Sequence, residues 1–227
     1  DIIGKSKYIL EKLKVHPTYG HYKKFKFCLA TENIFVSKSI NQYANNSIPS
    51  IYTMNDLFFE YYEKLYKIIS KTAIYQLLGE LRIEPRVTNI LKVPCFKTKI
   101  KGITLYNFNV DPRRLLEFAC VARRESGNEE YYQRMLEGRR LNEICKYLGY
   151  GIDYKDELFP QGKLFPNNII IAFFPDSEKT KPSFEKISDN KLTDDEFGTL
   201  TFPKSYRCCW VIDGQHRLFS FAKLGEL

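Results

Sequence analysis

The sequence predicts a mixed α/β fold, α/β or α+β in class, made of two units. Short strand-like runs alternate with amphipathic helical segments in the first third of the chain, and two strongly apolar runs lie in the last third. Hydrophobic residues make up 44% of the chain and aromatic residues 15%, which is enough for a sizeable core and too much for a disordered protein. We expect a smaller α/β unit over residues 1–85 and a larger unit over 86–227.

The first unit is predicted to contain a strand, a helix, a second strand and a long helix. Residues 23–33 favour a strand, 36–46 a short amphipathic helix and 48–54 the second strand. Asn55 or Asp56 can cap the long helix. Its apolar stripe is spaced by three and four residues and consists of Phe58, Tyr62, Leu65, Ile69, Ala73 and Leu77. This order is typical of a parallel α/β unit.

The same order is similar to the tail of a restriction-endonuclease-like domain. Such a nuclease needs an Asp and a Glu-x-Lys pair, because phosphodiester cleavage uses carboxylates to hold Mg²⁺ and a lysine beside the nucleophile. Residues 1–50 contain no such pair on adjacent predicted strands. We therefore expect any nuclease core to lie upstream of Asp1, and both ends of a longer protein to be missing.

The second unit begins after a boundary between residues 85 and 94. Residues 95–108 alternate and turn at Lys101–Gly102 like a β-hairpin. The Asp111–Pro112 pair is typical of a helix start, with Asp as the cap. One helix or a pair of helices is expected over residues 129–148.

The last third of the chain is predicted to hold two neighbouring strands of one mixed sheet. Residues 163–175 indicate a buried strand, and residues 206–212 a second strand that leads into a helix starting at 213 or 214. Residues 176–198, which are acidic and contain lysines, are expected to form an exposed loop between them.

The net charge of +8 is unevenly distributed. Residues 1–26 hold seven lysines against two acids, and residues 97–146 hold eleven Lys and Arg against seven acids. Such basic segments favour a polyanion such as DNA, although a solvated basic surface would look the same. The arginines that we expect to contact DNA are Arg113, Arg114, Arg123 and Arg124.

Several classes of protein are excluded or disfavoured. No apolar run is long enough to span a membrane, and the charged N-terminal segment is not a signal peptide. Six cysteines without a CxxC pair and three histidines give little support to a metal site, and none is expected. Scattered cysteines of this kind indicate reduced thiols in the cytoplasm. Cys208–Cys209 is read as part of a strand rather than as a redox-active pair.

The chemistry is expected at Asp213–Arg217, where a strand ends in Asp-Gly and a helix follows. A helix start offers N–H groups to an anion, Gly214 lets a phosphate approach the backbone, and Arg217 adds a guanidinium fork. Gln215 and His216 supply further donors. Asp213 would repel a phosphate and can instead face a metal ion, a ribose hydroxyl or Arg217. In the alternative reading Asp213 only caps the helix and Arg217 pairs with it on the surface.

The segment VIDGQHRLFSF resembles the signature of the DGQHR family, whose relatives include DndB of the DNA phosphorothioation systems. That family is similar to the ParB/sulfiredoxin superfamily, in which a Gly-x-x-Arg turn binds nucleotide phosphates. The resemblance extends upstream through YYQRMLEGRRLNEICKYL, GKLFPNNIIIAF, VPCF and DPRRLLEFACVARR, and so covers roughly residues 90–227. It implies a ParB-like mixed sheet, a bound nucleotide such as ATP or CTP with Mg²⁺, and work in DNA modification or antiviral defence.

The resemblance also implies which further residues face the cleft of Arg217. These are Gln133, Arg134 and Arg140, with Asn167 and Asn168 as polar walls. Each also has a plainer interpretation, since the two arginines can be solvated on a helix and Asn167 can simply make a turn. The partners implied are DNA, a nucleotide, the proteins of a modification or defence operon and a second copy of the chain, and no membrane.

Three functions remain open at this point. The first is a nucleotide-binding, DNA-associated protein of a bacterial modification or defence system, for which the sequence leaves open whether the nucleotide is hydrolysed. The second is a DNA-binding regulator that grips backbone phosphate and uses no nucleotide. The third is a nuclease whose catalytic core precedes this chain.

Overall fold

The computed structural model confirms the mixed α/β class. The structure describes residues 2–22, 24–34, 36–84, 90–121, 136–150, 162–174, 181–189 and 195–223. They form two compact units, residues 1–64 and 65–227, which we describe one at a time. The expected division between residues 85 and 86 stays a prediction about separately folding domains.

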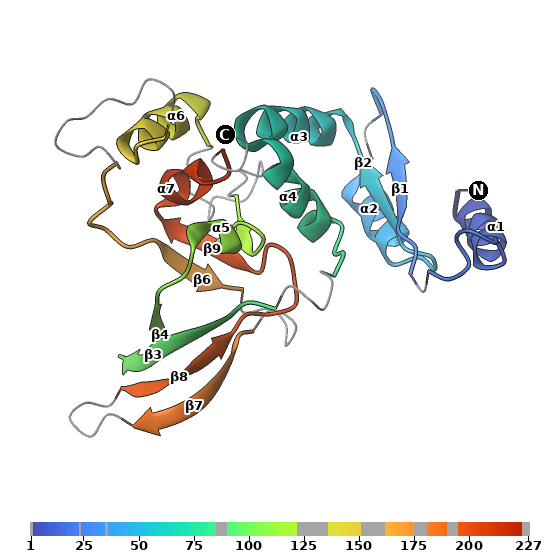
Figure 1. Ribbon diagram of the computed structural model, residues 1–227. Helices are drawn as coiled ribbons and strands as arrows, with labels where there is room; N and C mark the ends of the chain where they lie inside the picture. The colour runs from blue at the N-terminus through green and yellow to red at the C-terminus, as the bar shows by residue number, and fades with distance from the viewer. Residues whose placement is uncertain are drawn as a thin grey trace. The chain divides into compact units, whose positions relative to one another are not determined.

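The first unit contains the predicted strand, helix and strand (Figure 1). Strand β1 (Phe27–Ala30) and strand β2 (Ile51–Met54) pair in parallel, and helix α2 (Lys38–Asn45) connects them. The Ser37 side chain caps α2 by accepting a hydrogen bond from the N–H of Ile40. Helix α1 (Ile2–Lys14), to which the sequence interpretation gave no element, precedes them.

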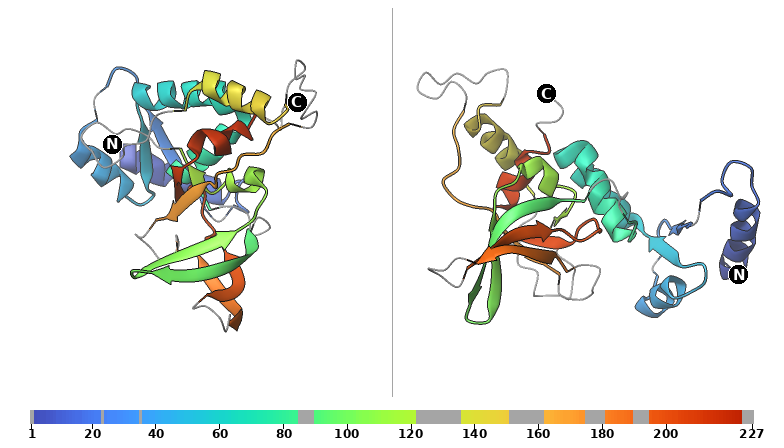
Figure 2. Two further views of the ribbon diagram at one scale, coloured as in Figure 1. Left: turned by 90° about the vertical axis from the view of Figure 1, so that its left-hand side faces the viewer. Right: turned by 60° about the horizontal axis from the view of Figure 1, so that its bottom comes forward.

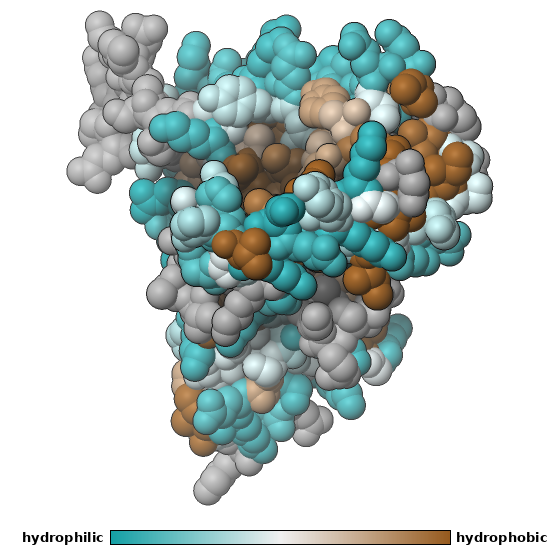
Figure 3. All heavy atoms as spheres, turned by 90° about the vertical axis from the view of Figure 1, so that its right-hand side faces the viewer, coloured by the Kyte–Doolittle hydropathy of each residue, from teal (hydrophilic) through white to brown (hydrophobic). Residues whose placement is uncertain are grey.

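Parallel sheets normally have both faces buried by other elements. A sheet of only two strands is small and covers little apolar surface. Hydrophilic side chains cover most of the molecular face shown in Figure 3, and hydrophobic groups gather there in several places. Among the described residues of the first unit, six aliphatic side chains are more than half exposed, namely Ile2, Val15, Ile34, Ile40, Ile48 and Leu57.

The predicted long helix is two helices, which corrects the sequence interpretation. Helix α3 (Asp56–Ile69) begins at the expected cap, since the Asn55 side chain accepts a hydrogen bond from the N–H of Phe58 at 3.1 Å. Ser70 then has φ +46°, in the left-handed region, and a 3₁₀ turn follows. Helix α4 (Ala73–Glu80) continues in a new direction (Figure 1). A periodic apolar stripe does not reveal a single left-handed residue within it.

The second unit holds a four-stranded antiparallel sheet in the order β4-β3-β8-β7. Its first two strands are the predicted hairpin, β3 (Lys92–Ile100) and β4 (Ile103–Phe108). The other two are β7 (Ser183–Asp189) and β8 (Glu196–Thr201). The expectation of an exposed loop over residues 176–198 is therefore wrong for the part that the structure describes.

The charges that suggested a loop are used within this sheet. Glu196 accepts a hydrogen bond from Lys97 at 2.5 Å and lies 3.4 Å from Lys186 on the other neighbouring strand. Phe184 and Leu200 lie on the same face, and Leu200 is fully buried. The register places the Lys97–Glu196 pair on the same face of the sheet as Leu200, so cross-strand ion pairs accommodate the charged residues beside the buried apolar ones.

The second sheet of this unit carries the candidate site. It has the order β5-β9-β6, with β5 (Ala119–Cys120) parallel and β6 (Ile170–Phe173) antiparallel to β9 (Cys209–Asp213). The predicted pairing of the two apolar runs is confirmed. The expectation that β6 is buried is wrong at its start, because β6 is an edge strand of the described sheet and Ile170 is 53% exposed.

Aromatic rings connect the two sheets. The ring of Phe202 contacts those of Phe108, Phe118 and Phe173, with centroids 5.7, 5.3 and 5.0 Å away. Phe202 is 2% exposed. Edge-to-face packing of this kind stabilises a core beyond the apolar area that it buries.

Helix α4 is bound to the open edge of β5 by the side chain of Gln76, which is 1% exposed. Its Nε2 donates to the carbonyl of Ala119 at 2.8 Å, and its Oε1 accepts from the N–H of Val121 at 2.9 Å. The amide therefore replaces a further strand at this edge, because it satisfies one backbone acceptor and one backbone donor.

Helices α5 (Pro112–Leu115), α6 (Gly138–Tyr147) and α7 (Gln215–Ser220) complete the second unit. Asp111 caps α5 as predicted, by accepting a hydrogen bond from the N–H of Arg113. Helix α6 covers part of the predicted 129–148 helix, and residues 129–135 lie outside the described residues. No helix among the described residues is long and apolar enough to cross a membrane.

Candidate functional site

The site is built where β9 ends and α7 begins. Val211 and Cys209 are fully buried, whereas Asp213 at the end of β9 is exposed. Gly214 follows with φ +86° and ψ +20°, a left-handed conformation that favours glycine, and it is the cap residue of α7. No side chain caps this helix. The capping part of the alternative is therefore wrong, whereas its other part, the pairing of Arg217 with Asp213, is present.

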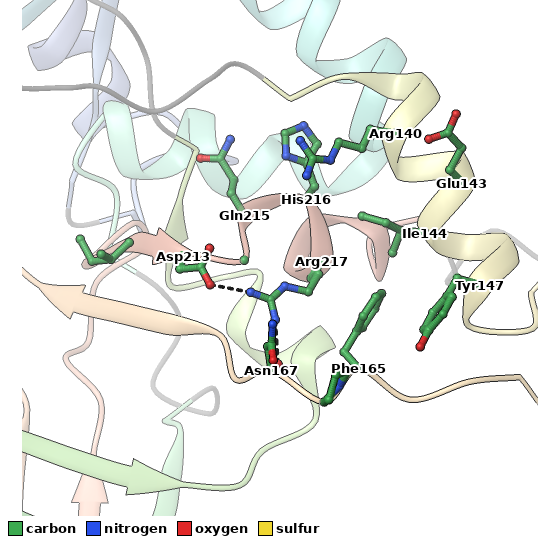
Figure 4. A pocket seen from close by; sticks show the side chains of 13 residues that line it. Arg140, Glu143, Ile144, Tyr147, Phe165, Asn167, Asp213, Gln215, His216 and Arg217 are labelled. Atoms are coloured by element: carbon green, nitrogen blue, oxygen red, sulfur yellow. Dashed lines mark hydrogen bonds and ion pairs between the residues drawn. The ribbon is translucent and has the colours of Figure 1, made fainter.

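Arg217 is held in place by two acceptors (Figure 4). Its Nη2 donates to the Asp213 carboxylate at 2.6 Å, and its Nη1 donates to the backbone carbonyl of Asn167 at 2.7 Å. The Arg217 side chain is only 16% exposed, and that of Asp213 is 63% exposed. The guanidinium thus joins α7 to the segment that precedes β6, and it is largely buried in the wall of the site.

Gly214 has a second reason to lack a side chain. A Cβ atom at this position would come within 3.1 Å of Nη2 and 3.2 Å of Nε of Arg217, and within 3.2 Å of Ile169. The space beside the Gly214 backbone is therefore filled by the Arg217 guanidinium. The sequence predicts instead that a phosphate approaches the backbone here, and that stays a prediction.

Helix α6 forms the opposite wall of a cleft of about 750 Å³. It packs on α7 through the Cys145 thiol, which donates to the Ser220 carbonyl at 3.5 Å, and through Lys223, which donates to the Asn142 side chain at 2.5 Å. The residues that line the cleft are Arg140, Glu143, Ile144, Tyr147, Phe165, Pro166, Asn167, Ile212, Asp213, Gly214, Gln215, His216 and Arg217. Their positions are shown in Figure 4.

One end of the cleft is aromatic. The rings of Tyr147 and Phe165 are stacked, with centroids 4.9 Å apart and planes 19° from parallel. The Tyr147 hydroxyl donates to the carbonyl of Leu164 at 3.2 Å, and Lys163 Nζ lies 5.9 Å from the Tyr147 ring centroid. These contacts fix two aromatic rings at this end of the cleft, and an aromatic ring can stack on a planar ligand group.

The other end of the cleft is cationic. Arg140 is exposed at the start of α6 and has no hydrogen bond or ion pair with any residue that the structure describes. His216 Nε2 accepts a hydrogen bond from the N–H of Glu137 at 3.2 Å, which holds the start of α6 beside α7. The neighbouring Arg139 is paired with Glu143 at 3.1 Å, and its side chain is 92% exposed. Of the two adjacent arginines, Arg139 is thus engaged in an ion pair, whereas Arg140 lines the cleft without one.

The structure brings most of the predicted ligand-binding residues together. Asp213, Gly214, Gln215, His216, Arg217, Arg140 and Asn167 all line one cleft. Asn168 is exposed and is not among the lining residues. Gln133 and Arg134 lie outside the described residues, so their predicted place at the cleft stays a prediction.

The sequence interpretation missed the residues of the aromatic end and one face of α6. Arg140, Glu143, Ile144 and Tyr147 are spaced by three, one and three residues, which places them on one side of a helix. Once Arg140 is placed at the cleft, this helical spacing predicts that the other three residues line the cleft as well. Nothing in the sequence alone could place Phe165 against Tyr147.

Two of the four arginines predicted to contact DNA are described. Arg113 is engaged by Asp111, to which its Nη2 donates at 2.6 Å, and this hydrogen bond lowers the pKa of the Asp111 carboxyl. Arg114 is exposed, and its side chain has no hydrogen bond or ion pair with a described residue. Arg123 and Arg124 lie outside the described residues.

The cysteines do not form a metal site in the described part of the chain, and all six are free thiols. Cys209 lies in β9, as the strand interpretation expects, but Cys208 lies before β9, which begins three residues later than predicted. Arg207 donates from Nη2 and Nε to the Cys120 sulfur at 3.2 and 3.3 Å. Burial nevertheless raises the pKa of the Cys120 thiol.

Comparison with known proteins adds no relative. No family model, curated protein or solved structure matches the chain. The arguments about function therefore depend on the geometry of the cleft and on the resemblance of its short motifs.

Proposed function

We propose that the cleft between α6 and α7 binds a nucleotide, and that the protein is DNA-associated. The observation that supports this most directly is that one cleft has a basic end and an aromatic end. Arg140 and His216 lie at one end, the stacked rings of Tyr147 and Phe165 lie at the other, and Arg217 lies between them. Phosphates suit the first group and a base suits the second.

The nucleotide is expected to be ATP or CTP with Mg²⁺. Asp213 and Glu143 are the carboxylates of the cleft, and either could contact a magnesium ion carried by the phosphates. We also propose that the nucleotide is hydrolysed. Asp213 and Glu143 are then the candidates to orient the attacking water.

The cellular role is proposed from the motif. The resemblance of VIDGQHRLFSF to the DGQHR signature supports work in a bacterial DNA-modification or phage-defence system, together with other proteins of such an operon. The excess of basic residues supports contact with DNA. Free cysteines support a cytoplasmic location.

Calorimetric titration of the protein with ATP, CTP and GTP, each with and without Mg²⁺, tests this function. Saturable heat with one of these ligands is the expected result. If no nucleotide binds at millimolar concentration, the anion held by this cleft is DNA backbone phosphate, and the regulator function takes the place of the nucleotide one.

A further inference from the structure

The two edge strands of the four-stranded sheet differ in how well they are protected against pairing with a further strand. Its order β4-β3-β8-β7 leaves β4 and β7 with one unpaired side each among the described strands. β7 has an irregular register between Lys186 and Ser188, and it carries the charged residues Glu185 and Lys186. Bulges and charges of this kind prevent pairing with another strand.

The β4 edge has none of these features. Its sequence ITLYNF contains no charged residue and no proline, and its register with β3 is regular from end to end. Figure 2 shows the β3–β4 hairpin (green) along one margin of the sheet, with β7 and β8 on its other side. An uncharged and regular edge strand is a template for pairing with another strand.

The backbone of β4 offers hydrogen-bonding groups at this edge. Lys101 has φ +49° and Gly102 has φ +84°, so they form a two-residue hairpin turn with Ile100 opposite Ile103. The residues that flank such a turn bond to each other, and bonding then alternates along the strand. The N–H and C=O groups of Thr104 and Tyr106 consequently point away from β3. No hydrogen bond joins them to a described residue.

An apolar patch lies beside this edge on the outer face of the sheet. It consists of Phe96, Ile100, Ile103 and Leu105, which are between 41% and 65% exposed. The register places Ile100 opposite Ile103, and Thr98 opposite Leu105. Val93 and Cys95, on the other face of β3, are buried. The patch therefore belongs to the face that points away from the core.

We infer that β4 pairs antiparallel with β4 of a second copy of this chain, about a two-fold axis at Leu105. This register extends the sheet across the two copies and pairs residues 103–107 of β4 with their symmetry mates. It brings Thr104 opposite Tyr106 of the partner subunit, so the outward backbone groups of both residues are satisfied. The axis is perpendicular to the sheet, so the two apolar patches lie on the same face and become continuous.

A second copy fits this edge for reasons of charge and symmetry. β4 has no charge, so two copies meet without like charges directly opposite each other. Isologous pairing requires a strand to be complementary to itself. The alternation of β4 meets that requirement, because Leu105 then faces Leu105 of the partner subunit and Ile103 faces Asn107 of the partner subunit.

Sedimentation velocity over a range of concentrations tests the inference. The wild-type chain should show a monomer–dimer equilibrium. Leu105→Lys should raise the dimer dissociation constant at least about tenfold, because each dimer loses two apolar contacts and gains two facing ammonium groups. Ile187→Lys is the matched control, since Ile187 is as exposed as Ile103 but lies on the irregular β7 edge. It should leave the dimer unchanged, and circular dichroism should show both variants folded.

A cross-link tests the register itself. Leu105 bonds towards β3, so Leu105 and its symmetry mate form a non-hydrogen-bonded pair, with Cα atoms about 4.5 Å apart. That separation lies within the disulfide range of about 4.4–6.8 Å. With the exposed Cys28 replaced by Ser, Leu105→Cys should give a covalent dimer under mild oxidation, and Ile187→Cys should not. A wild type that stays monomeric at every concentration, or equal cross-linking of both variants, would overturn the inference.

Discussion

Arg217 in α7 and Asp213 at the end of β9 form a 2.6 Å ion pair in the wall of the cleft. The same guanidinium donates to the Asn167 carbonyl, so Arg217 is oriented before any ligand arrives. Further N–H donors of the guanidinium are not used by these two bonds. Arg217 is therefore both a structural connection between α7 and the segment before β6 and a cation within the cleft.

The ion pair predicts that Asp213 opposes phosphate binding when no metal is present. Asp213→Asn removes the negative charge, while the amide oxygen can still accept from Arg217. Without Mg²⁺ we expect nucleotide affinity to rise several-fold, equivalent to roughly 1 kcal/mol for a partly exposed charge. Calorimetry in EDTA measures this. Glu185→Gln on β7 is the control for net charge and should have no effect, and a fall in affinity with Asp213→Asn would contradict the prediction.

Gly214→Ala should damage the cleft as well as the backbone. Its φ of +86° is costly for other residues, by about 1 kcal/mol, and a methyl group would press on the Arg217 guanidinium. Gly102→Ala is a matched control, because φ there is +84° and nothing lies within 4 Å of the added atom. Thermal melts should show a similar loss for both variants. Only Gly214→Ala should also weaken nucleotide binding, and equal affinities would contradict this account of Gly214.

Gln76→Ala should destabilise the second unit strongly. The substitution leaves the buried carbonyl of Ala119 and the N–H of Val121 without the amide that satisfies them, at a cost of about 2–4 kcal/mol. Urea denaturation measures the free energy of unfolding. The exposed Gln42 on α2 gives a control of the same residue type, and Gln42→Ala should change stability little. Equal effects would show that the Gln76 amide does not stabilise the edge of β5.

The contrast between Arg113 and Arg114 predicts different contributions to DNA binding. The Arg114 side chain has no hydrogen bond or ion pair with a described residue, whereas Arg113 is held by Asp111. Arg114→Gln should weaken duplex binding at every sequence and reduce the slope of log affinity against log salt by roughly 0.9, the value for one phosphate contact. Arg113→Gln should do less. Binding assays at several salt concentrations decide this, and an unchanged slope for Arg114→Gln would place the DNA face elsewhere.

Local patterns were sufficient to predict much of the fold. The alternation in residues 95–108 and the Lys101–Gly102 turn predicted the hairpin, and two apolar runs predicted the pair β6–β9. The acidic segment before β8 misled the interpretation, because Lys97, one of the two partners of Glu196, comes from a strand far away in the sequence. The break at Ser70 was missed for a related reason, since one residue with positive φ leaves no trace in the apolar spacing.

The candidate site could be predicted only in part. The Gly-x-x-Arg spacing identified Gly214 and Arg217, and a helix does begin directly after Gly214 and contain Arg217. The stacking of Phe165 on Tyr147 depends on how α6 packs against the segment before β6, which no local pattern encodes. The place of the Arg217 guanidinium beside Gly214 likewise required the tertiary structure.

The most direct test of the proposed nucleotide site compares the two adjacent arginines of α6. Arg217 is unsuitable, because its removal also breaks the connection to Asn167. Arg140 faces the cleft without a described partner, whereas Arg139 is paired with Glu143 and is not among the lining residues. In calorimetric titrations with ATP and CTP, Arg140→Ala should weaken binding about tenfold, equivalent to roughly 1.4 kcal/mol, and Arg139→Ala should not. Equal affinities for the two variants, or no binding by the wild type, would contradict the proposal.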